Sequence, residues 1–411
     1  MSIKIIHTGD MHLGGAYAEK AAASIEFLLD QLENSDSPAF HPDLVVVTGD
    51  TTDKPLHVHS EHLNPLINLI WSVECPMVFL QGTPSHEPLN FLRNLEEAAG
   101  RGITVFDTPE VFMGKISEMP CKGTASDKQV AIATLPAVSR ALLDQWTWHL
   151  LDHPDDDPQE NIRALLGRIR NNWSDPLPPH WADFKGPKIL LGHFTVSGCK
   201  TGTGQTLYGS DIAVSLEDLA VSGADAVLLG HIHHAQEWRD PLFVSYCGST
   251  HPVNWGELDA KSFSVLEFDE ATGKLVNFQR VPFPHKPMAK FDLEFTGEQQ
   301  NGEWVGSCDS AVIDPLLNQS DIEVKCCYSV PKELAVQIDD MYVRIMFKNR
   351  GLDLAAVERT IKSTTRERIA DIASKETTRQ QYEAVCTAKS EDARPGALTK
   401  ADMIDETGVP L

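Results

Sequence analysis

Aspartate and histidine recur directly after short apolar runs in this chain of 411 residues. The first such cluster contains Asp10 and His12, which follow the apolar run at 3–6. Four further clusters follow apolar runs in the same way: Gly49-Asp50, Gly82 to His86-Glu87, Gly192-His193 and Gly230-His231-Ile232-His233. Carboxylate oxygens and imidazole nitrogens bind divalent metal ions, and imidazole transfers protons near neutral pH. The clusters therefore indicate metal-ligand chemistry.

The apolar runs predict strands that would bring these side chains together. They are rich in β-branched residues and leucine, which is typical of strands buried on both faces. They span 3–6, 43–48, 78–81, 189–191 and 226–229, with 130–135 as a further strand. Helical stretches are expected at 21–33, 61–73, 88–99, 139–151 and 158–172. This alternation is typical of a layered α/β domain, and such sheets bind ligands at the carboxyl ends of their strands.

Glycine at each strand exit permits a sharp turn of the backbone, so that the following side chain can point into a crevice. Each cluster taken alone has an ordinary structural explanation, such as a buried histidine bonded to a backbone carbonyl. Chance would not place all five clusters at strand exits. We therefore expect the five strand ends to converge on one site.

Length and composition limit the class of protein. The chain is long enough for two or three domains, and 42% of its residues are hydrophobic. No apolar stretch approaches the roughly 20 residues that span a bilayer, and no signal peptide is evident. The eight cysteines form no CxxC pair, which favours a reducing, cytoplasmic environment. A net charge of −24 argues against coating nucleic acid by bulk positive charge, but metal ions can neutralise local carboxylates, so a nuclease is not excluded.

The pattern changes after the cluster at 230–233. Short strands are expected at 242–246, 263–268, 275–281 and 289–295, and this section should add a second sheet to the first. Pro282, Pro284 and Pro287 indicate a linker. We therefore predict a catalytic domain at 1–285, a small α/β capping domain at 286–350 and a helical, partly flexible tail at 351–411.

Within the capping domain, strands are expected at 291–295, 322–330 and 342–347, with a helix at 332–339. The helical spacing of Leu354, Val357 and Ile361, continued by Ile369 and Ile372, predicts that the tail begins as a helix. The stretch past Thr377 is polar and is expected to be loosely ordered.

A two-metal hydrolytic site needs a carboxylate that bridges both ions and several neutral imidazoles, with positions left open for water and a phosphate oxygen. The clusters supply these groups, with His86 close by. The candidate ligands are Asp10, His12, Asp50, His193, His231 and His233. An oxygen and nitrogen ligand set favours manganese, and iron or zinc could also occupy it.

The order Asp-x-His, Gly-Asp, Gly to His-Glu, Gly-His, Gly-His-x-His resembles the calcineurin-like metallophosphoesterase superfamily. Within it, three segments resemble the SbcD-type exonuclease subunit of double-strand-break repair complexes: 193–198, 230–233 and the Gly-Ser to Gly-Glu segment at 246–257. The superfamily motifs cover about 3–257. Beyond them the resemblance rests on domain layout.

The resemblance implies a four-layered α-β-β-α sandwich with a small capping domain. It also implies that Asp10, His12, Asp50 and His233 bind one metal ion, and that Asp50 bridges to a second ion. It further implies that His193 and His231 bind this second ion. His86 would be a catalytic residue that does not bind metal.

One segment departs from the family pattern. The family usually has Gly-Asn-His, in which the Asn carbonyl is a ligand of the second metal, whereas this chain has Gly82-Thr83-Pro84-Ser85-His86. Ser85 precedes the histidine, and a hydroxyl is a poorer ligand than an amide oxygen. The second metal is therefore expected to bind more weakly, or through water at Ser85.

These patterns predict a two-metal-dependent DNA nuclease, exonuclease or endonuclease, that hydrolyses phosphodiester bonds in DNA end processing and repair. The resemblance implies an SbcC-type coiled-coil ATPase as partner, which we expect to dock on 352–372; a homodimer is left open. Two alternatives remain: a phosphomonoesterase or cyclic-nucleotide phosphodiesterase, and a weakly active or inactive DNA-end-binding scaffold. Activity with manganese on linear DNA, beside a simple phosphate diester, distinguishes all three.

Overall fold

The computed structural model describes residues 2–57, 59–88, 90–99, 103–120, 123, 126–150, 157–170, 180–202, 212–300, 303–308, 322–362, 375, 377–388 and 393–407. The chain divides into two compact units, 1–289 with 321–323, and 290–320 with 324–411. The chain first leaves unit 1 after Ala289, so the proline-rich stretch at 282–287 belongs to unit 1.

Unit 1 contains two six-stranded sheets. The first has the order β12-β11-β1-β2-β3-β4, in which β1 to β4 are parallel and β11 and β12 are antiparallel additions. Its strands are β1 (Ser2–Thr8), β2 (Leu44–Thr48), β3 (Met77–Leu80), β4 (Thr104–Phe106), β11 (Ser262–Asp269) and β12 (Leu275–Pro282). Every residue of β2 is buried, as expected for a parallel strand covered on both faces.

The second sheet has the order β5-β6-β7-β8-β10-β9, and its β6, β7, β8 and β10 are parallel. Its strands are β5 (Val111–Lys115), β6 (Gln129–Leu135), β7 (Lys188–His193), β8 (Ala226–Gly230), β9 (Gln236–Trp238) and β10 (Phe243–Tyr246). The expectation that the strands after the 230–233 cluster would build the second sheet is wrong. That sheet already begins at β5, and β11 and β12 return to the first sheet because β11 pairs with β1.

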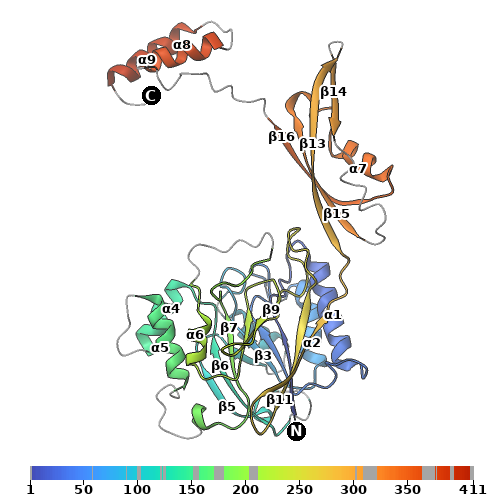
Figure 1. Ribbon diagram of the computed structural model, residues 1–411, viewed down its shortest axis with the longest axis vertical. Helices are drawn as coiled ribbons and strands as arrows, with labels where there is room; N and C mark the ends of the chain where they lie inside the picture. Colours follow the sequence, from blue (N-terminus) through green and yellow to red (C-terminus); the bar gives the residue numbers. More distant parts are fainter. Residues whose placement is uncertain are drawn as a thin grey trace. The chain divides into compact units, whose positions relative to one another are not determined.

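Helices cover the outer face of each sheet (Figure 1). The first sheet carries α1 (Ala18–Glu33), α2 (Asn64–Ser72) and α3 (Phe91–Ala99). The second carries α4 (Arg140–Leu150), α5 (Pro158–Arg170) and α6 (Leu216–Val221). Short 3₁₀ turns are η1 (Glu61–Leu63), η2 (Ile116–Glu118) and η4 (Trp181–Asp183). In α1 the buried Ala21, Ile25, Leu28 and Leu32 form one apolar stripe.

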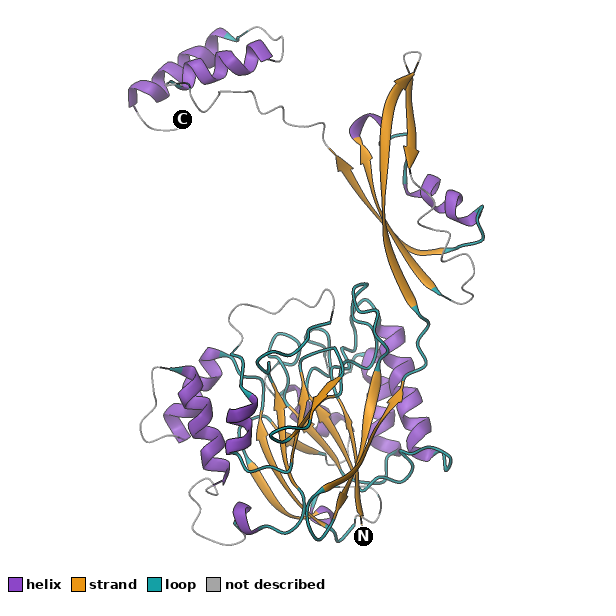
Figure 2. Cartoon of the chain, viewed as in Figure 1, coloured by secondary structure: helices purple, strands orange, loops and turns teal. Residues whose placement is uncertain are grey.

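A third apolar core lies between the two sheets. It joins Ile5 and Val46 of the first sheet to Leu191 and Leu228 of the second. Side chains of β1, β2, β7 and β8 thus alternate between this inner core and the outer cores under the helices. Unit 1 is therefore the α-β-β-α sandwich that the sequence predicts, and its loops gather where the parallel strands end (Figure 2).

Unit 2 contains a four-stranded sheet of order β14-β13-β15-β16. Its strands are β13 (Met288–Gln300), β14 (Glu303–Cys308), β15 (Glu323–Pro331) and β16 (Leu354–Lys362), and its helical elements are η6 (Lys332–Leu334), α7 (Asp340–Lys348), α8 (Thr378–Ala388) and α9 (Pro395–Thr407). The helix predicted at 332–339 is only the turn η6. The strand predicted at 342–347 is wrong, because these residues belong to α7. The Asp339 side chain caps α7 by accepting from the amide of Tyr342 (2.8 Å).

The helix predicted from Leu354 is also wrong. Leu354, Val357 and Ile361 lie in β16, which pairs in parallel with β15. Pairing with a neighbouring strand outweighs the helical spacing of a segment that is also rich in β-branched residues. Ile369 and Ile372 lie outside the described residues. The stretch past Thr377, expected to be loose, instead contains α8 and α9, which pack on each other and bury Cys386 and Ala401.

Within the described residues, no helix combines the length and the apolar character that a membrane-spanning segment requires.

Gly230, the last residue of β8, marks a close approach of the two sheets. A methyl group on Gly230 would overlap the backbone carbonyl of Thr48, the last residue of β2. We expect Gly230→Ala to lower the free energy of unfolding by about 1–3 kcal/mol in urea titrations. The matched control is Gly167→Ala inside α5, where the nearest atom lies at 3.9 Å; it should raise stability by about 0.5–1 kcal/mol. Equal effects of the two substitutions would contradict this interpretation of the sheet contact.

Candidate metal centre

The loops after β1 and β2 are joined by backbone hydrogen bonds. The amide of Asp10 donates to the carbonyl of Gly49 (2.9 Å), and the amide of His12 donates to the carbonyl of Asp50 (3.0 Å). The parallel pairing of β1 and β2 therefore continues beyond the strand ends, which places Asp10 and His12 beside Asp50.

Four of the candidate ligands have left-handed backbone conformations, with φ of 47° at Asp10, 44° at His12, 47° at Asp50 and 89° at His231. Such conformations are uncommon for residues other than glycine and cost about 1–3 kcal/mol each. At His231 the amide donates to both carboxylate oxygens of Asp10 (2.9 and 3.1 Å). Strain of this kind concentrates where function requires a particular side-chain direction.

Asp10, His12 and His233 form a first buried group, in which the potential ligand atoms lie within 4.8 Å of one another. The Nε2 atoms of His12 and His233 face each other at 3.0 Å. His233 donates from Nδ1 to Oε1 of Glu257 (2.8 Å), so in the neutral ring Nε2 carries a lone pair directed at His12.

Asp50, His193 and His231 form a second group with the same 4.8 Å limit. Oδ2 of Asp50 lies 3.2 Å from Nε2 of His193. His193 donates from Nδ1 to the carbonyl of Thr48 (2.8 Å), which again leaves Nε2 directed into the group. The contact between Asp10 and the amide of His231 joins the two groups.

Burial and charge oppose each other at Asp50 and His193. Burial alone would raise the pKa of Asp50 and lower that of His193. Their mutual attraction outweighs burial: it holds the pKa of Asp50 well below its ordinary value and raises the pKa of His193 to about 9. At Asp10 burial prevails over the attraction of His193 and His233, and the pKa is raised. The centre therefore favours positive charge between its carboxylates.

The donor set fits divalent cations. It combines two carboxylates with four imidazoles, and three of these rings have a nitrogen that faces another member of its group. The buried thiol of Cys247 lies near Thr48 rather than in either group, and burial raises its pKa, so it remains protonated. Oxygen and nitrogen donors without thiolate suit manganese, iron or zinc.

His86 lies at the edge of the first group. Its Nδ1 donates to the backbone carbonyl of Asp53 (2.6 Å), and its ring lies edge-on to that of His12, with 5.0 Å between the centroids. The Asp53 carboxylate approaches Nδ1 of the buried His12 at 3.6 Å. The pattern Gly-Asp-x-x-Asp at 49–53 was a signal for Asp53 that the sequence reasoning missed.

Thr83, rather than Ser85, faces the second group. The Thr83 amide donates to Oδ1 of Asp50 (2.6 Å), and its hydroxyl lies 3.2 Å from Oδ2 of Asp50 and 3.3 Å from Nε2 of His193. Ser85 is an exposed turn residue, and the hydrogen bonds of the described residues include none from its side chain to the candidate ligands. Ser85 therefore does not face the centre, although it directly precedes His86.

Glu87 connects two loops of the centre. Its fully buried carboxylate accepts from the amide of Thr51 and from that of Gly82 (2.7 Å). It therefore fastens the segment after β3 to the residue that follows Asp50. Glu87 was visible in the sequence beside His86, but nothing in the pattern assigned it this role.

A hollow of about 60 Å³ adjoins the second group. Its wall includes Thr83, Val138, Phe194, Thr195 and His231. It provides a mainly apolar surface directly beside the candidate ligands.

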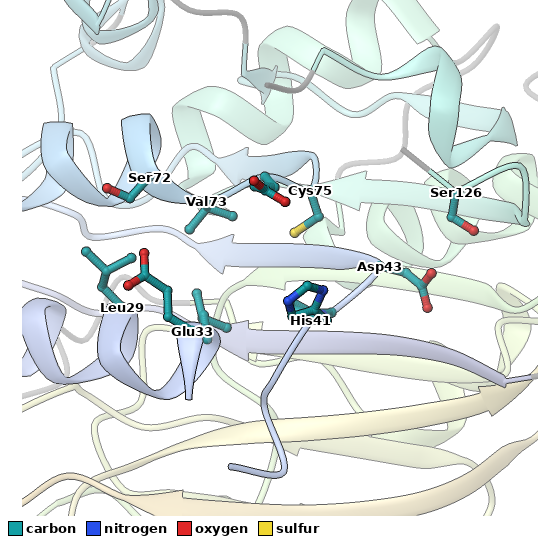
Figure 3. A pocket seen from close by; sticks show the side chains of 11 residues that line it. Leu29, Glu33, His41, Asp43, Ser72, Val73, Cys75 and Ser126 are labelled. Atoms are coloured by element: carbon teal, nitrogen blue, oxygen red, sulfur yellow. The ribbon is translucent and has the colours of Figure 1, made fainter. Parts of the chain in front are cut away.

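A cavity of about 470 Å³ lies elsewhere in unit 1 (Figure 3). It is lined by His41 and Asp43 before β2, by Val73 and Cys75 before β3, and by Glu33 at the end of α1. These residues lie at the amino ends of β2 and β3, whereas the candidate ligands follow the carboxyl ends. This cavity is not part of the centre.

Comparison with known families agrees with this geometry. The model of the calcineurin-like phosphoesterase family matches residues 3–235, which include all six candidate ligands. The chain belongs to this family. Its members are metallophosphoesterases. The α-β-β-α sandwich and the oxygen and nitrogen donors of this chain therefore agree with a metal-dependent phosphoesterase.

The phosphoesterase is also similar to curated proteins along most of its length. It is 23% identical over 384 residues to the SbcD subunit of the SbcCD nuclease of Escherichia coli K12, covering 91% of each chain. It is 23% identical over 303 residues to the corresponding SbcCD nuclease subunit of Staphylococcus epidermidis, covering 71% of this chain and 72% of the relative. These similarities support an SbcD-type assignment within the family.

Two solved structures align with the phosphoesterase at 13% identity. GAP50 of Plasmodium covers 69% of this chain and 90% of its own, with a TM-score of 0.36. TT1561 of Thermus thermophilus covers 68% of this chain and 99% of its own, with a TM-score of 0.37.

The stability of the metal-free phosphoesterase should depend on Glu87. Burial, reinforced by Asp50, raises its pKa from 4.5 to about 7. Because the folded-state pKa exceeds the unfolded one, the folded state binds the proton more tightly, and this contribution to stability is lost as pH rises from about 4.5 through 7. We expect urea titrations in the presence of a chelator to show wild-type stability falling relative to Glu87→Gln between pH 5 and 8. A constant difference between the two proteins would contradict the raised pKa.

Proposed function

We propose that this phosphoesterase is a two-metal-dependent DNA nuclease that cleaves phosphodiester bonds in DNA end processing and repair, together with an SbcC-type ATPase. The observation that carries the proposal is the pair of adjoining groups, one with Asp10 and one with Asp50, with His86 at their edge. Similarity over most of the chain to the SbcD subunit of the SbcCD nuclease supports DNA as the substrate.

In this proposal Asp10, His12 and His233 bind one ion, while His193 and His231 bind the other. Asp50 would be the ligand shared by the two ions, since it contacts His193 directly and interacts electrostatically with His12. Manganese is the favoured ion for this donor set. When bound, such ions lower the pKa of water and stabilise negative charge on the phosphate oxygens.

His86 would supply the proton that the departing sugar oxygen needs. The carbonyl of Asp53 accepts the Nδ1 proton and orients the ring. The proton given to the sugar oxygen would be the one on Nε2 of the doubly protonated ring, and its transfer would leave the neutral ring with its proton on Nδ1. Nε2 then points away from Asp53 and can exchange a proton with the substrate. A ring oriented through one nitrogen and reactive through the other is the arrangement expected of a general acid.

Thr83 would take the place that the sequence suggested for Ser85. Its hydroxyl already contacts both Asp50 and His193. It can therefore ligate the second ion directly or orient a water molecule on it, which favours an active enzyme over an inactive scaffold.

The proposal is tested with purified protein, manganese and three substrates: labelled linear DNA, a simple phosphate diester and a phosphate monoester. A DNA nuclease cleaves DNA efficiently and the simple diester slowly. Preference for the monoester would support the phosphomonoesterase alternative, whereas DNA binding without cleavage of any substrate would support the scaffold.

Replacing the proposed general acid should separate catalysis from metal binding. We expect His86→Ala to reduce DNA turnover by about 10²- to 10⁴-fold, because a positioned acid contributes about that much. Its manganese content should remain that of the wild type. The control is His57→Ala, which changes an exposed histidine and should leave both quantities unchanged. Undiminished cleavage by His86→Ala would refute the assignment.

The proposed docking site for the ATPase moves from 352–372 to the α8–α9 pair. Residues 354–362 are committed to β16 and its pairing with β15, whereas α8 and α9 form a helical pair that continues the chain beyond the sheet. Deleting residues 376–411 should abolish co-purification with the ATPase while hydrolysis of the simple diester is retained. Val336→Ser, which alters a 91% exposed side chain before α7, should leave co-purification intact. If the deletion leaves co-purification intact and Val336→Ser abolishes it, the docking surface lies in the part of unit 2 that contains the sheet.

A further inference from the structure

The segment at 248–261 surrounds His233, although its sequence suggested no chemical role beyond family resemblance. Glu257 is fully buried within it. One carboxylate oxygen of Glu257 accepts from Nδ1 of His233 and from the side chain of Asn254, both at 2.8 Å. The other accepts from Lys261 (2.8 Å), the Ser249 hydroxyl (3.3 Å) and the amide of Val253 (3.2 Å). Both oxygens are therefore fully occupied, and one of them is directed at the ring of a candidate ligand.

Lys261 holds the peptide group of His233. Its side chain is only 1% exposed, and Nζ donates to the backbone carbonyl of His233 (3.1 Å) as well as to Glu257. The amide of Ser249 donates to that carbonyl too (3.2 Å). His233 is thus held at both its ring and its peptide group by one short segment.

The buried ion pair is not explained by stability alone. Removing a carboxylate and an ammonium from water costs several kcal/mol per ion, and apolar residues of similar volume often stabilise a fold equally well. A carboxylate on the outer nitrogen of a metal-binding histidine, by contrast, fixes its tautomer and raises its basicity.

We infer that Glu257, held by Lys261, is a positioning residue that directs Nε2 of His233 at the first metal ion. This inference rests on the proposed function only in taking His233 as a metal ligand. Its role is to orient one ligand, so its loss should affect one of the two metal sites selectively.

The test is Glu257→Gln in the full-length protein. The amide can still accept from His233, but its NH₂ group meets the donors Lys261 and Ser249, so the side chain cannot keep its present orientation. Titration of the chelator-treated protein with MnCl₂ by calorimetry should show one of two sites weakened by about 10- to 100-fold, the range found when such supporting partners are removed. The melting temperature without metal should fall as well, because the buried Lys261 loses its counter-charge; a loss of fold stability alone would not weaken one metal site more than the other.

The matched control is Asp259→Asn. It removes one negative charge from the same segment, where Asp259 lies 3.5 Å from Lys261 and 3.4 Å from His234, and the bond between Glu257 and His233 stays intact. Manganese affinity of this variant should stay within about twofold of wild type, since partly exposed ion pairs contribute little.

Unchanged Mn²⁺ binding in Glu257→Gln would overturn the inference. Equal weakening of both sites together with a large loss of metal-free stability would also overturn it, because that pattern describes a purely structural residue. Failure of the wild type to bind two Mn²⁺ ions would also overturn the inference, because His233 would then have no metal site of its own to serve. If the wild type binds two ions but cleaves no DNA, the nuclease proposal fails while the positioning role stands.

Discussion

The close approach of two sheets at their carboxyl ends is the constraint on which the centre depends. Gly230 lies directly against Thr48, and Gly49 lies so near His193 that a methyl group on it would overlap the His193 ring. Only at this separation can residues after β1 and β2 share a site with residues after β7 and β8. The glycines before the clusters serve mainly close packing: Gly230 packs against the other sheet and Gly82 against Asp50 of its own sheet. Of these glycines only Gly49 has a left-handed backbone, with φ of 84°. Elsewhere the turn is made by the ligands themselves.

That arrangement concentrates unfavourable features in a small volume. Four residues are strained, and two carboxylates are buried close together. The compensation is local: backbone bonds join the first two loops, Glu87 fastens the third, and the segment around Glu257 holds His233. The surrounding α-β-β-α sandwich, with apolar cores on both sides of each sheet, provides the rigidity against which this strain is maintained.

The sequence predicted those parts of the molecule that local patterns determine. Buried strands followed by Asp or His are visible as apolar runs, and the structure brings those six polar side chains into two adjoining groups; their role as ligands stays a prediction. Supporting residues were missed because their partners are distant in the chain, as with Glu257 and His233. The turn at 82–87 misled because sequence position suggested Ser85, whereas it is Thr83 whose amide and hydroxyl contact Asp50. In unit 2, the pairing of 354–362 with β15 overrode the helical spacing of Leu354 and Val357.

The acidic composition and a DNA substrate are compatible for an electrostatic reason. The net charge of −24 is a property of the whole chain, whereas a phosphate group responds mainly to charges within about one Debye length, roughly 8–10 Å. Within the centre, Asp10 and Asp50 contribute two negative charges and the imidazoles can be neutral. Two divalent ions, as proposed, would add four positive charges and make the loaded centre positive. Binding of phosphate would then depend on metal loading, so residues that set metal affinity, such as Glu257, would also control access of the substrate to the site.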